Sequence, residues 1–136
     1  MRCLVVDDEP RLRRVLIRLL EGEGFTCAEA GSGVEAVAEL EKGPVPLVIS
    51  DLRMPEMDGV TLLREIITRW PETAVIVVTA VAEVESAVAC LQMGALDYVA
   101  KPFHLDEVRA RVSQALDKRR LIIENRTYQQ SLEERV

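Results

Sequence analysis

The stretch VISDLRMP, residues 48–55, decides how the rest of the chain is interpreted. Its apolar run ends in the carboxylate of Asp51, and Pro55 follows four residues later. An apolar run of this length beside a loop predicts a buried strand, with Asp51 at its carboxyl end. One acidic strand end means little by itself, so its meaning depends on what the other strands carry.

Length and composition place the chain among single-domain globular proteins. It has 136 residues, of which 49% are hydrophobic and 29% charged, which is enough for one core and too few for two. The net charge is -6 and no long basic run exists, so we expect no nucleic-acid binding by this segment. No apolar run approaches the roughly 20 residues that cross a membrane, and the N-terminus enters a strand directly. We therefore expect a cytoplasmic (cytosolic) protein without a signal peptide.

Three cysteines occur, and they are widely separated in the sequence. Cys3, Cys27 and Cys90 form neither a CxxC motif nor a zinc-ligand spacing. We interpret them as reduced, small core residues.

Apolar periodicity predicts five strands that alternate with five helices. The strands are expected at 3–6, 25–30, 45–50, 74–79 and 97–100, and the 25–30 segment is the least apolar, which is typical of an edge. Ser32 with Glu35 predicts a capping box, and Asp58 predicts the N-cap of the third helix. The helix that carries Val84 has no such cap, so we expect a frayed start. This alternation is typical of an α/β protein with a parallel sheet and helices on both faces.

The predicted strand ends carry chemistry that a parallel sheet would bring to one edge. They are Asp7 and Asp8 after the first strand, Asp51 after the third, Thr79 after the fourth and Lys101 after the fifth. Clustered carboxylates with room for water suit Mg²⁺. A divalent cation beside a lysine and a threonine indicates phosphoryl transfer, with Asp51 as the nucleophile.

These features resemble the receiver domain of bacterial two-component response regulators, a chemotaxis-regulator-like, flavodoxin-like family. The resemblance covers residues 1 to about 118. It rests on Asp7-Asp8, on Asp51-x-x-Met54-Pro55 with Gly59, on Thr79-Ala80, and on Tyr98-x-x-Lys101-Pro102. It implies the strand order 2-1-3-4-5 for the five-stranded sheet, with an extended last helix.

The resemblance also implies a role for each motif residue. Asp51 would accept a phosphoryl group from a sensor histidine kinase. Asp8, Asp51 and the backbone carbonyl of Arg53 would bind Mg²⁺ directly, and Asp7 would act mainly through a bound water.

Further motif residues would bind the phosphoryl group or report its presence. Thr79, Ala80 and Lys101 would bind it, and Tyr98 would switch together with Thr79, while Pro55, Gly59 and Pro102 shape the loops. A partner would read the face made by the fourth helix, fifth strand and fifth helix. The protein would catalyse only its own phosphorylation and dephosphorylation.

Residues 119–136 are predicted to form a helical linker outside the receiver domain. The best heptad positions are Ile122, Asn125, Gln129, Leu132 and Val136, two of them polar. A solvated extension and the start of a coiled coil therefore both stay open, as does a homodimer through this helix. We expect an output domain beyond Val136; the linker is similar to those of regulators with HD-GYP phosphodiesterase or AAA+ outputs.

Other interpretations of the same residues also stay open. Asp7-Asp8-Glu9 could serve only as the acidic start of a helix, Thr79 as a strand residue and Tyr98 as packing. A Mg²⁺-dependent phosphatase of the haloacid dehalogenase type uses a similar residue set, but places its nucleophile in an Asp-x-Asp motif after strand one. A receiver-like interaction module that acts without phosphorylation is the remaining alternative.

Overall fold

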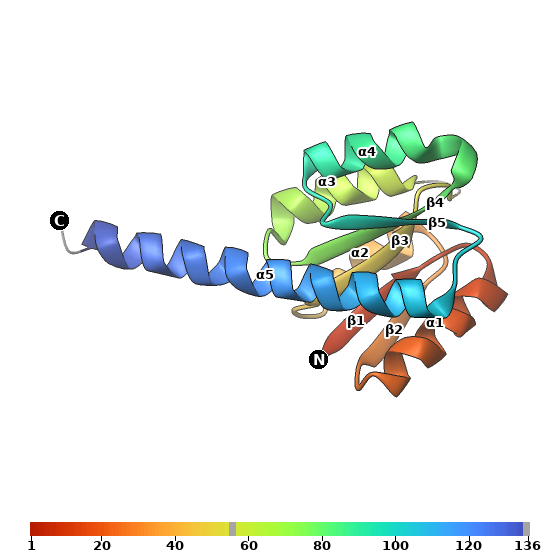
Figure 1. Cartoon of the computed structure of the whole chain (residues 1–136), viewed down its shortest axis with the longest axis horizontal. Helices are drawn as coiled ribbons and strands as arrows, with labels where there is room; N and C mark the ends of the chain where they lie inside the picture. The colour runs from red at the N-terminus through yellow and green to blue at the C-terminus, as the bar shows by residue number, and fades with distance from the viewer. Residues whose placement is uncertain (55–56, 135–136) are drawn as a thin grey trace.

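A computed structural model describes residues 1–54 and 57–134. Strands and helices alternate along the chain as predicted (Figure 1). Their bounds are β1 (Arg2–Val6), α1 (Pro10–Gly22), β2 (Thr26–Ala30), α2 (Gly33–Glu41), β3 (Leu47–Asp51), α3 (Gly59–Arg69), β4 (Ala74–Ala80), the 3₁₀ turn η1 (Val81–Glu83), α4 (Val84–Met93), β5 (Asp97–Lys101) and α5 (Leu105–Glu134).

The five strands form one parallel sheet in the order β2-β1-β3-β4-β5, which confirms the predicted order. Every residue of the central strand β3 is buried. The edge strand β2 has exposed residues at Thr26 and Glu29, as its lower apolar content predicted. The sheet therefore places the stretch around Asp51 at its centre.

Helices cover both faces of the sheet (Figure 1). On one face α1 and α5 pack through Leu16, Leu20 and Val112. On the other, α2, α3 and α4 contribute Leu40, Ile66 and other buried side chains. Each fully buried Leu or Ile contributes roughly 1.5–3 kcal/mol through loss of apolar surface from water.

Two of the predicted helix starts carry side-chain caps. The Ser32 hydroxyl accepts a hydrogen bond from the Glu35 amide at 3.2 Å, and Asp58 Oδ1 accepts one from Thr61 at 2.8 Å. The capping box is only half formed, because the Glu35 carboxylate accepts from the Gly31 amide instead of that of Ser32. As predicted, α4 begins without a side-chain cap among the described residues, directly after η1.

The bounds of all five strands differ from the prediction by one or two residues. β3 begins at Leu47 rather than residue 45, since Pro46 has no N–H to donate to a neighbouring strand. β4 and β5 each run one residue further, to Ala80 and Lys101. Strand pairing at Lys101 therefore fixes the face of the sheet from which its side chain projects.

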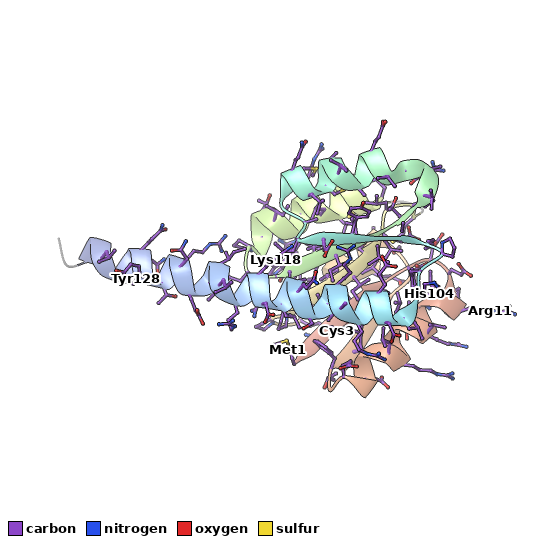
Figure 2. All side chains as sticks on the ribbon, viewed as in Figure 1. Met1, Cys3, Arg11, His104, Lys118 and Tyr128 are labelled. Carbon is purple, nitrogen blue, oxygen red and sulfur yellow. The ribbon has the colours of Figure 1, made fainter. Side chains whose placement is uncertain are left out.

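Helix α5 continues well beyond the domain (Figures 1 and 2). Its first half is anchored by buried Val108 and Ala115, whereas Tyr128 is 64% exposed. Lys118 Nζ donates to the Leu96 carbonyl at 3.3 Å and Arg119 Nε to that of Glu72 at 2.7 Å, so contact with the domain extends through residue 119. The domain boundary at 118 stays a prediction, and Val136 of the heptad register lies outside the described residues.

Among residues 1–54 and 57–134, none of the helices combines the length and the apolar character needed to cross a bilayer.

Candidate phosphorylation site

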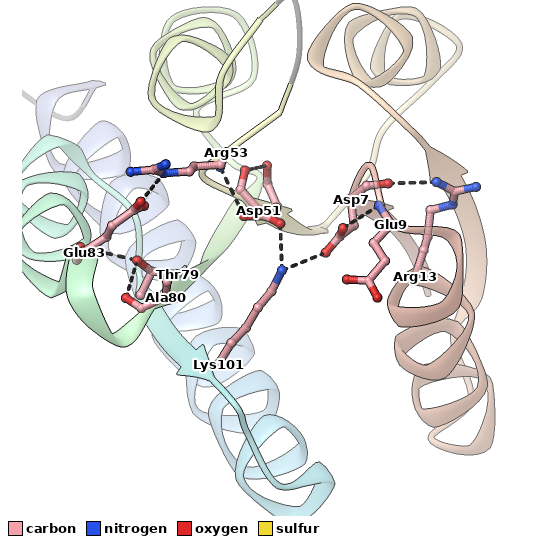
Figure 3. Close-up of polar contacts among 10 residues, drawn as sticks. Asp7, Glu9, Arg13, Asp51, Arg53, Thr79, Ala80, Glu83 and Lys101 are labelled. Atoms are coloured by element: carbon pink, nitrogen blue, oxygen red, sulfur yellow. Dashed lines mark hydrogen bonds and ion pairs between the residues drawn. The ribbon is translucent and has the colours of Figure 1, made fainter.

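The pleat of the sheet brings Asp7, Asp51 and Lys101 together. Asp51 and Lys101 end their strands, and Asp7 follows β1 by one residue. All three continue the alternate positions that face α1 and α5, because side chains two apart in a strand share a face. Lys101 Nζ lies 2.8 Å from Asp51 Oδ2 and 3.7 Å from Asp7 Oδ2 (Figure 3).

Asp7 is buried, and its two carboxylate oxygens differ in their hydrogen bonding. Its Oδ1 accepts a hydrogen bond from the Glu9 amide at 2.8 Å. Its Oδ2 is buried without a hydrogen-bond partner among the described residues. Burial, with the charge of Asp51, raises the pKa of Asp7 to about 6, although Glu9 and Lys101 act in the opposite direction. A bound cation would stabilise the ionised form of this carboxylate.

Asp7, Asp8 and Asp51 form a cluster suited to a hard cation. Each offers one carboxylate oxygen, and these oxygens lie within 4.8 Å of one another. At about 4 Å, two carboxylates at a protein surface repel by roughly 4 kcal/mol, which a divalent cation reverses. Asp8 is exposed and leaves the cluster open to water, and hydrated Mg²⁺ prefers such oxygen ligands. The residues present therefore fit the predicted cation.

Lys101 is held as a cation by its two acidic neighbours. Burial acts to lower the pKa of Lys101, but the hydrogen bond and charge of Asp51, with the charge of Asp7, outweigh burial and raise it. Asp51 Oδ1 accepts a further hydrogen bond from the Arg53 amide at 3.1 Å. The carboxylate of Asp51 is thus held at both oxygens.

Thr79 lies at the same edge but follows the opposite face of the sheet. It continues the series of Val75 and Val77, which faces α3 and α4. Thr79 is only 1% exposed. Its hydroxyl lies within hydrogen-bond distance of the carbonyl oxygens of Ala80 (3.2 Å) and Glu83 (3.3 Å) (Figure 3). Thr79 is therefore turned away from Asp51 in this conformation.

Tyr98 shares the sheet face of Thr79. It is half-buried, packs against the α2–α4 core and lies opposite Val77 in the β4–β5 register. Thr79 is two residues further along β4 and hence a diagonal neighbour on the same face. The strand register thus places Thr79 and Tyr98 close together. This placement is compatible both with a switching role for Tyr98 and with a role in packing alone.

The loop residues differ in how far the structure describes them. A Cβ on Gly59 would lie 2.6 Å from the Cα of Leu52 and nearer still to the Asp51 carbonyl oxygen, so only glycine fits there. The Lys101–Pro102 peptide bond is cis. Pro55, predicted to shape the loop, lies outside the described residues.

Two residues at this edge were not foreseen from the sequence. Glu83 forms an ion pair with Arg53 across the site, and Arg13 Nη1 donates to the Asp7 carbonyl at 2.7 Å (Figure 3). Glu83 is 30 residues from Arg53 in the sequence, and Arg13 is six residues from Asp7. Neither pair belongs to a known motif, so no signal in the sequence indicated these contacts. The acidic-start interpretation of Asp7-Asp8-Glu9 is incomplete, because Asp7 and Asp8 precede the N-cap Glu9, whose side chain makes no cap hydrogen bond in the described chain.

The family model for the response regulator receiver domain matches residues 3–113. The chain belongs to this family. Among curated proteins, it is 40% identical over 129 residues to the C4-dicarboxylate transport transcriptional regulatory protein DctD of Rhizobium meliloti, covering 95% of this chain and 28% of DctD. It is 44% identical over 112 residues to the DNA-binding transcriptional regulator NtrC of Salmonella typhimurium, covering 82% of this chain and 24% of NtrC.

Solved structures agree with the family assignment. The receiver domain of NtrX from Brucella abortus is 32% identical, with a TM-score of 0.82, and the match covers 85% of this chain and 98% of that one. The receiver domain of an HD domain-containing protein from Pseudomonas fluorescens is 29% identical, with a TM-score of 0.83, and the match covers 90% and 91%.

Family membership supports one of the predicted classes of function. Like other receiver domains, the chain is a signalling switch controlled by phosphorylation. It spans about a quarter of the length of the curated relatives DctD and NtrC.

Proposed function

We propose that Asp51 is the phosphoryl acceptor of this receiver domain and that a sensor histidine kinase is the donor. The observation that carries the proposal is Lys101, whose ammonium group lies between Asp51 and Asp7. It would neutralise charge on a phosphoryl group as the Asp51 carboxylate oxygen forms its bond to phosphorus. The chemistry is the protein's own phosphorylation and later hydrolysis, with no metabolite turned over.

The acidic cluster would hold Mg²⁺ for this reaction. Asp7, Asp8, Asp51 and the Arg53 backbone carbonyl are the proposed ligand groups. The buried Oδ2 of Asp7, which accepts no hydrogen bond from the described residues, supports them. When bound, Mg²⁺ supplies positive charge beside the phosphoryl oxygens. The residues themselves hold the acceptor carboxylate in place, through the Arg53 amide and Lys101.

Thr79 and Tyr98 would report the phosphoryl group to a partner. The Thr79 hydroxyl would have to leave the carbonyls of Ala80 and Glu83 to reach a phosphoryl group on Asp51. Tyr98 would then turn toward the space that Thr79 leaves. The face of α4, β5 and α5 would carry this change, since η1 has no buried residue and α4 begins without a side-chain cap among the described residues.

The partners proposed beyond the kinase come from the relatives. DctD, NtrC and the Escherichia coli regulatory protein AtoC are regulators of which this chain matches one part, so we propose an output region following residue 136 and a cytoplasmic location. The Pseudomonas fluorescens relative is the receiver domain of an HD domain-containing protein, which supports an HD-type domain as that output region. A homodimer through α5 is a separate proposal.

Phosphorylation by a small donor tests the proposed acceptor. The full chain is incubated with acetyl phosphate and Mg²⁺ and weighed by intact-mass spectrometry. We expect one added phosphoryl group per chain, absent with EDTA and absent in Asp51→Asn. Asp58→Asn is the matched control, because it changes a carboxylate in the same loop while asparagine remains a good N-cap for α3.

Each other outcome identifies a different alternative. An adduct that persists in Asp51→Asn would place the acceptor elsewhere. No adduct in the wild type would favour an interaction module that acts without phosphorylation, and release of phosphate over many turnovers from phosphate esters would favour a phosphatase.

A further inference from the structure

Cys3 and Cys27, 24 residues apart in the sequence, face each other across two neighbouring strands. They are register partners in the parallel β1–β2 pair, and their side chains belong to the same core layer beneath α1 and α5. Their sulfur atoms lie 3.1 Å apart. Cys3 is fully buried, whereas Cys27 is half-buried.

This geometry is close to that of a disulfide. Neighbouring strands are about 4.7–4.9 Å apart, which falls inside the roughly 4.4–6.8 Å between Cα atoms that a disulfide spans. Bond formation would bring the two sulfur atoms together by only about 1 Å. Rotation of the side chains and small movement of β2 can supply that distance, because β2 is an edge strand of the sheet.

We propose that Cys3 and Cys27 are a redox modification site that forms a reversible intramolecular disulfide with a small-molecule disulfide oxidant. The proposal is independent of phosphoryl transfer. The two cysteines lie toward the start of β1 and β2, whereas Asp7 and Asp51 lie at the carboxyl ends of the strands.

The reaction proceeds by two thiol–disulfide exchanges. The half-buried Cys27 loses its proton to solvent, and its sulfur attacks the oxidant RSSR, which forms Cys27–S–SR and releases RS⁻. Deprotonated Cys3 then attacks the Cys27 sulfur, forms the Cys3–Cys27 bond and releases the second RS⁻. Both thiolates released take up the protons lost, so two protein thiols are oxidised while RSSR is reduced to two RSH.

The order of these exchanges follows from exposure. The oxidant can reach Cys27 first, since Cys3 is 0% exposed. Burial raises the pKa of both thiols, with their mutual contact raising that of Cys3 and lowering that of Cys27. We therefore expect oxidation to be slow at neutral pH and faster at higher pH, where more thiolate is present.

Cys90 provides an internal control for selectivity. It is also fully buried, but it lies on α4 and belongs to the core layer on the opposite face of the sheet. The sheet separates it from both other cysteines. A disulfide that formed through random collisions would not distinguish among the three thiols, whereas the folded chain should join only Cys3 to Cys27.

The physical consequence is a covalent tie on an edge strand. The disulfide would close the segment β1–α1–β2 and oppose separation of β2 from the sheet. It would also reduce the freedom of the unfolded chain, which raises the thermal midpoint unless the new bond is strained.

Thiol counting on the full chain tests the proposal. Reduced protein is incubated with oxidised glutathione at pH 8, then denatured in guanidinium chloride at the same pH with excess iodoacetamide, and weighed. The reduced wild type should take up three labels, and the oxidised wild type one label with a mass about 2 Da below that of the singly labelled dithiol. A tryptic digest should link peptide 3–11 to peptide 19–42.

Variants make the result specific. Cys90→Ala should take up no label after oxidation, and Cys27→Ala should form no intramolecular disulfide. Dithiothreitol should restore all three thiols of the wild type. Three free thiols after oxidation, a stable glutathione adduct on Cys27 of the wild type, or links that include Cys90 would each overturn the proposal.

Discussion

Gly59 shows how little space the site leaves around the backbone of Asp51. Its amide donates to the Leu52 carbonyl at 2.9 Å, so the start of α3 lies directly against the end of β3. A side chain at this position would meet backbone atoms of Asp51 and Leu52, which cannot turn aside as a flexible side chain can. The residue therefore sets the position of the acceptor carboxylate without any chemistry of its own.

Replacing Gly59 tests this close approach. Gly59→Ala should lose roughly 1–3 kcal/mol of unfolding free energy, because overpacking forces the backbone to shift. Urea denaturation measures the loss. Gly22→Ala is the matched control: a Cβ there meets nothing within 4 Å, and alanine in a helix is better by about 0.5–1 kcal/mol. Equal stability of the two variants would contradict the packing described for Gly59.

At the scale of elements, α5 is one helix with two environments. From Val108 to Ala115 it packs on the sheet, and Lys118 and Arg119 reach carbonyl groups of the domain. Beyond that point Leu121, Ile122 and Tyr128 are 55%, 40% and 64% exposed. A lone helix without tertiary packing is marginal in water, so the extension depends on what it contacts in the full protein.

Hydrogen exchange distinguishes these two parts of α5. We expect amides of residues 108–116 to be protected with the core, and amides of residues 124–134 to exchange far faster at low protein concentration. Truncation after Arg120 should leave the thermal midpoint of the domain nearly unchanged. Equal protection along the helix, independent of concentration, would show that the extension is held by the chain itself. Protection that grows with concentration would support the homodimer.

For the whole molecule, the carboxyl edge of the sheet is a place where folding concentrates negative charge. Asp7, Asp8 and Asp51 arrive from two strands, and Lys101 from a third. An ionised Asp7 is costly there, as its pKa of about 6 indicates. The metal-free state of a cation-binding site is destabilised by this charge, and binding of the cation offsets the loss of stability.

Stability should therefore depend on pH through Asp7. An acid whose pKa is higher in the folded chain than in the unfolded chain favours folding at low pH. This contribution is complete below pH 4 and is lost as the pH rises through about 6. In metal-free buffer, the wild type should lose about 1 kcal/mol more between pH 5 and pH 7 than Asp7→Asn does.

Urea unfolding at both pH values measures this difference. At pH 7, Asp7→Asn should be the more stable protein by up to about 3 kcal/mol, and Mg²⁺ should stabilise the wild type more than the variant. An identical pH dependence of the two proteins would show that Asp7 is not strained by burial.

Much of the fold could be predicted because its signals are local. Apolar periodicity located all five strands and the helices, and Asp58 was correctly expected to cap α3. The prediction failed in detail where a partner lay elsewhere, as with Glu35, which binds the Gly31 amide rather than completing the capping box. Strand ends shifted where Pro46 interrupted pairing or the neighbouring strand offered one more residue.

The candidate site was predictable as a set of residues but not as a geometry. The side chains that end each strand could be predicted from the sequence, because strand periodicity and the following turns are local properties of the chain. Three contacts could not be predicted before the chain was folded: Lys101 bridges Asp51 and Asp7, Thr79 turns toward Glu83, and Cys3 meets Cys27. These depend on strand register, on the face to which each pleat points and on burial, which arise when distant segments pack together and water is excluded.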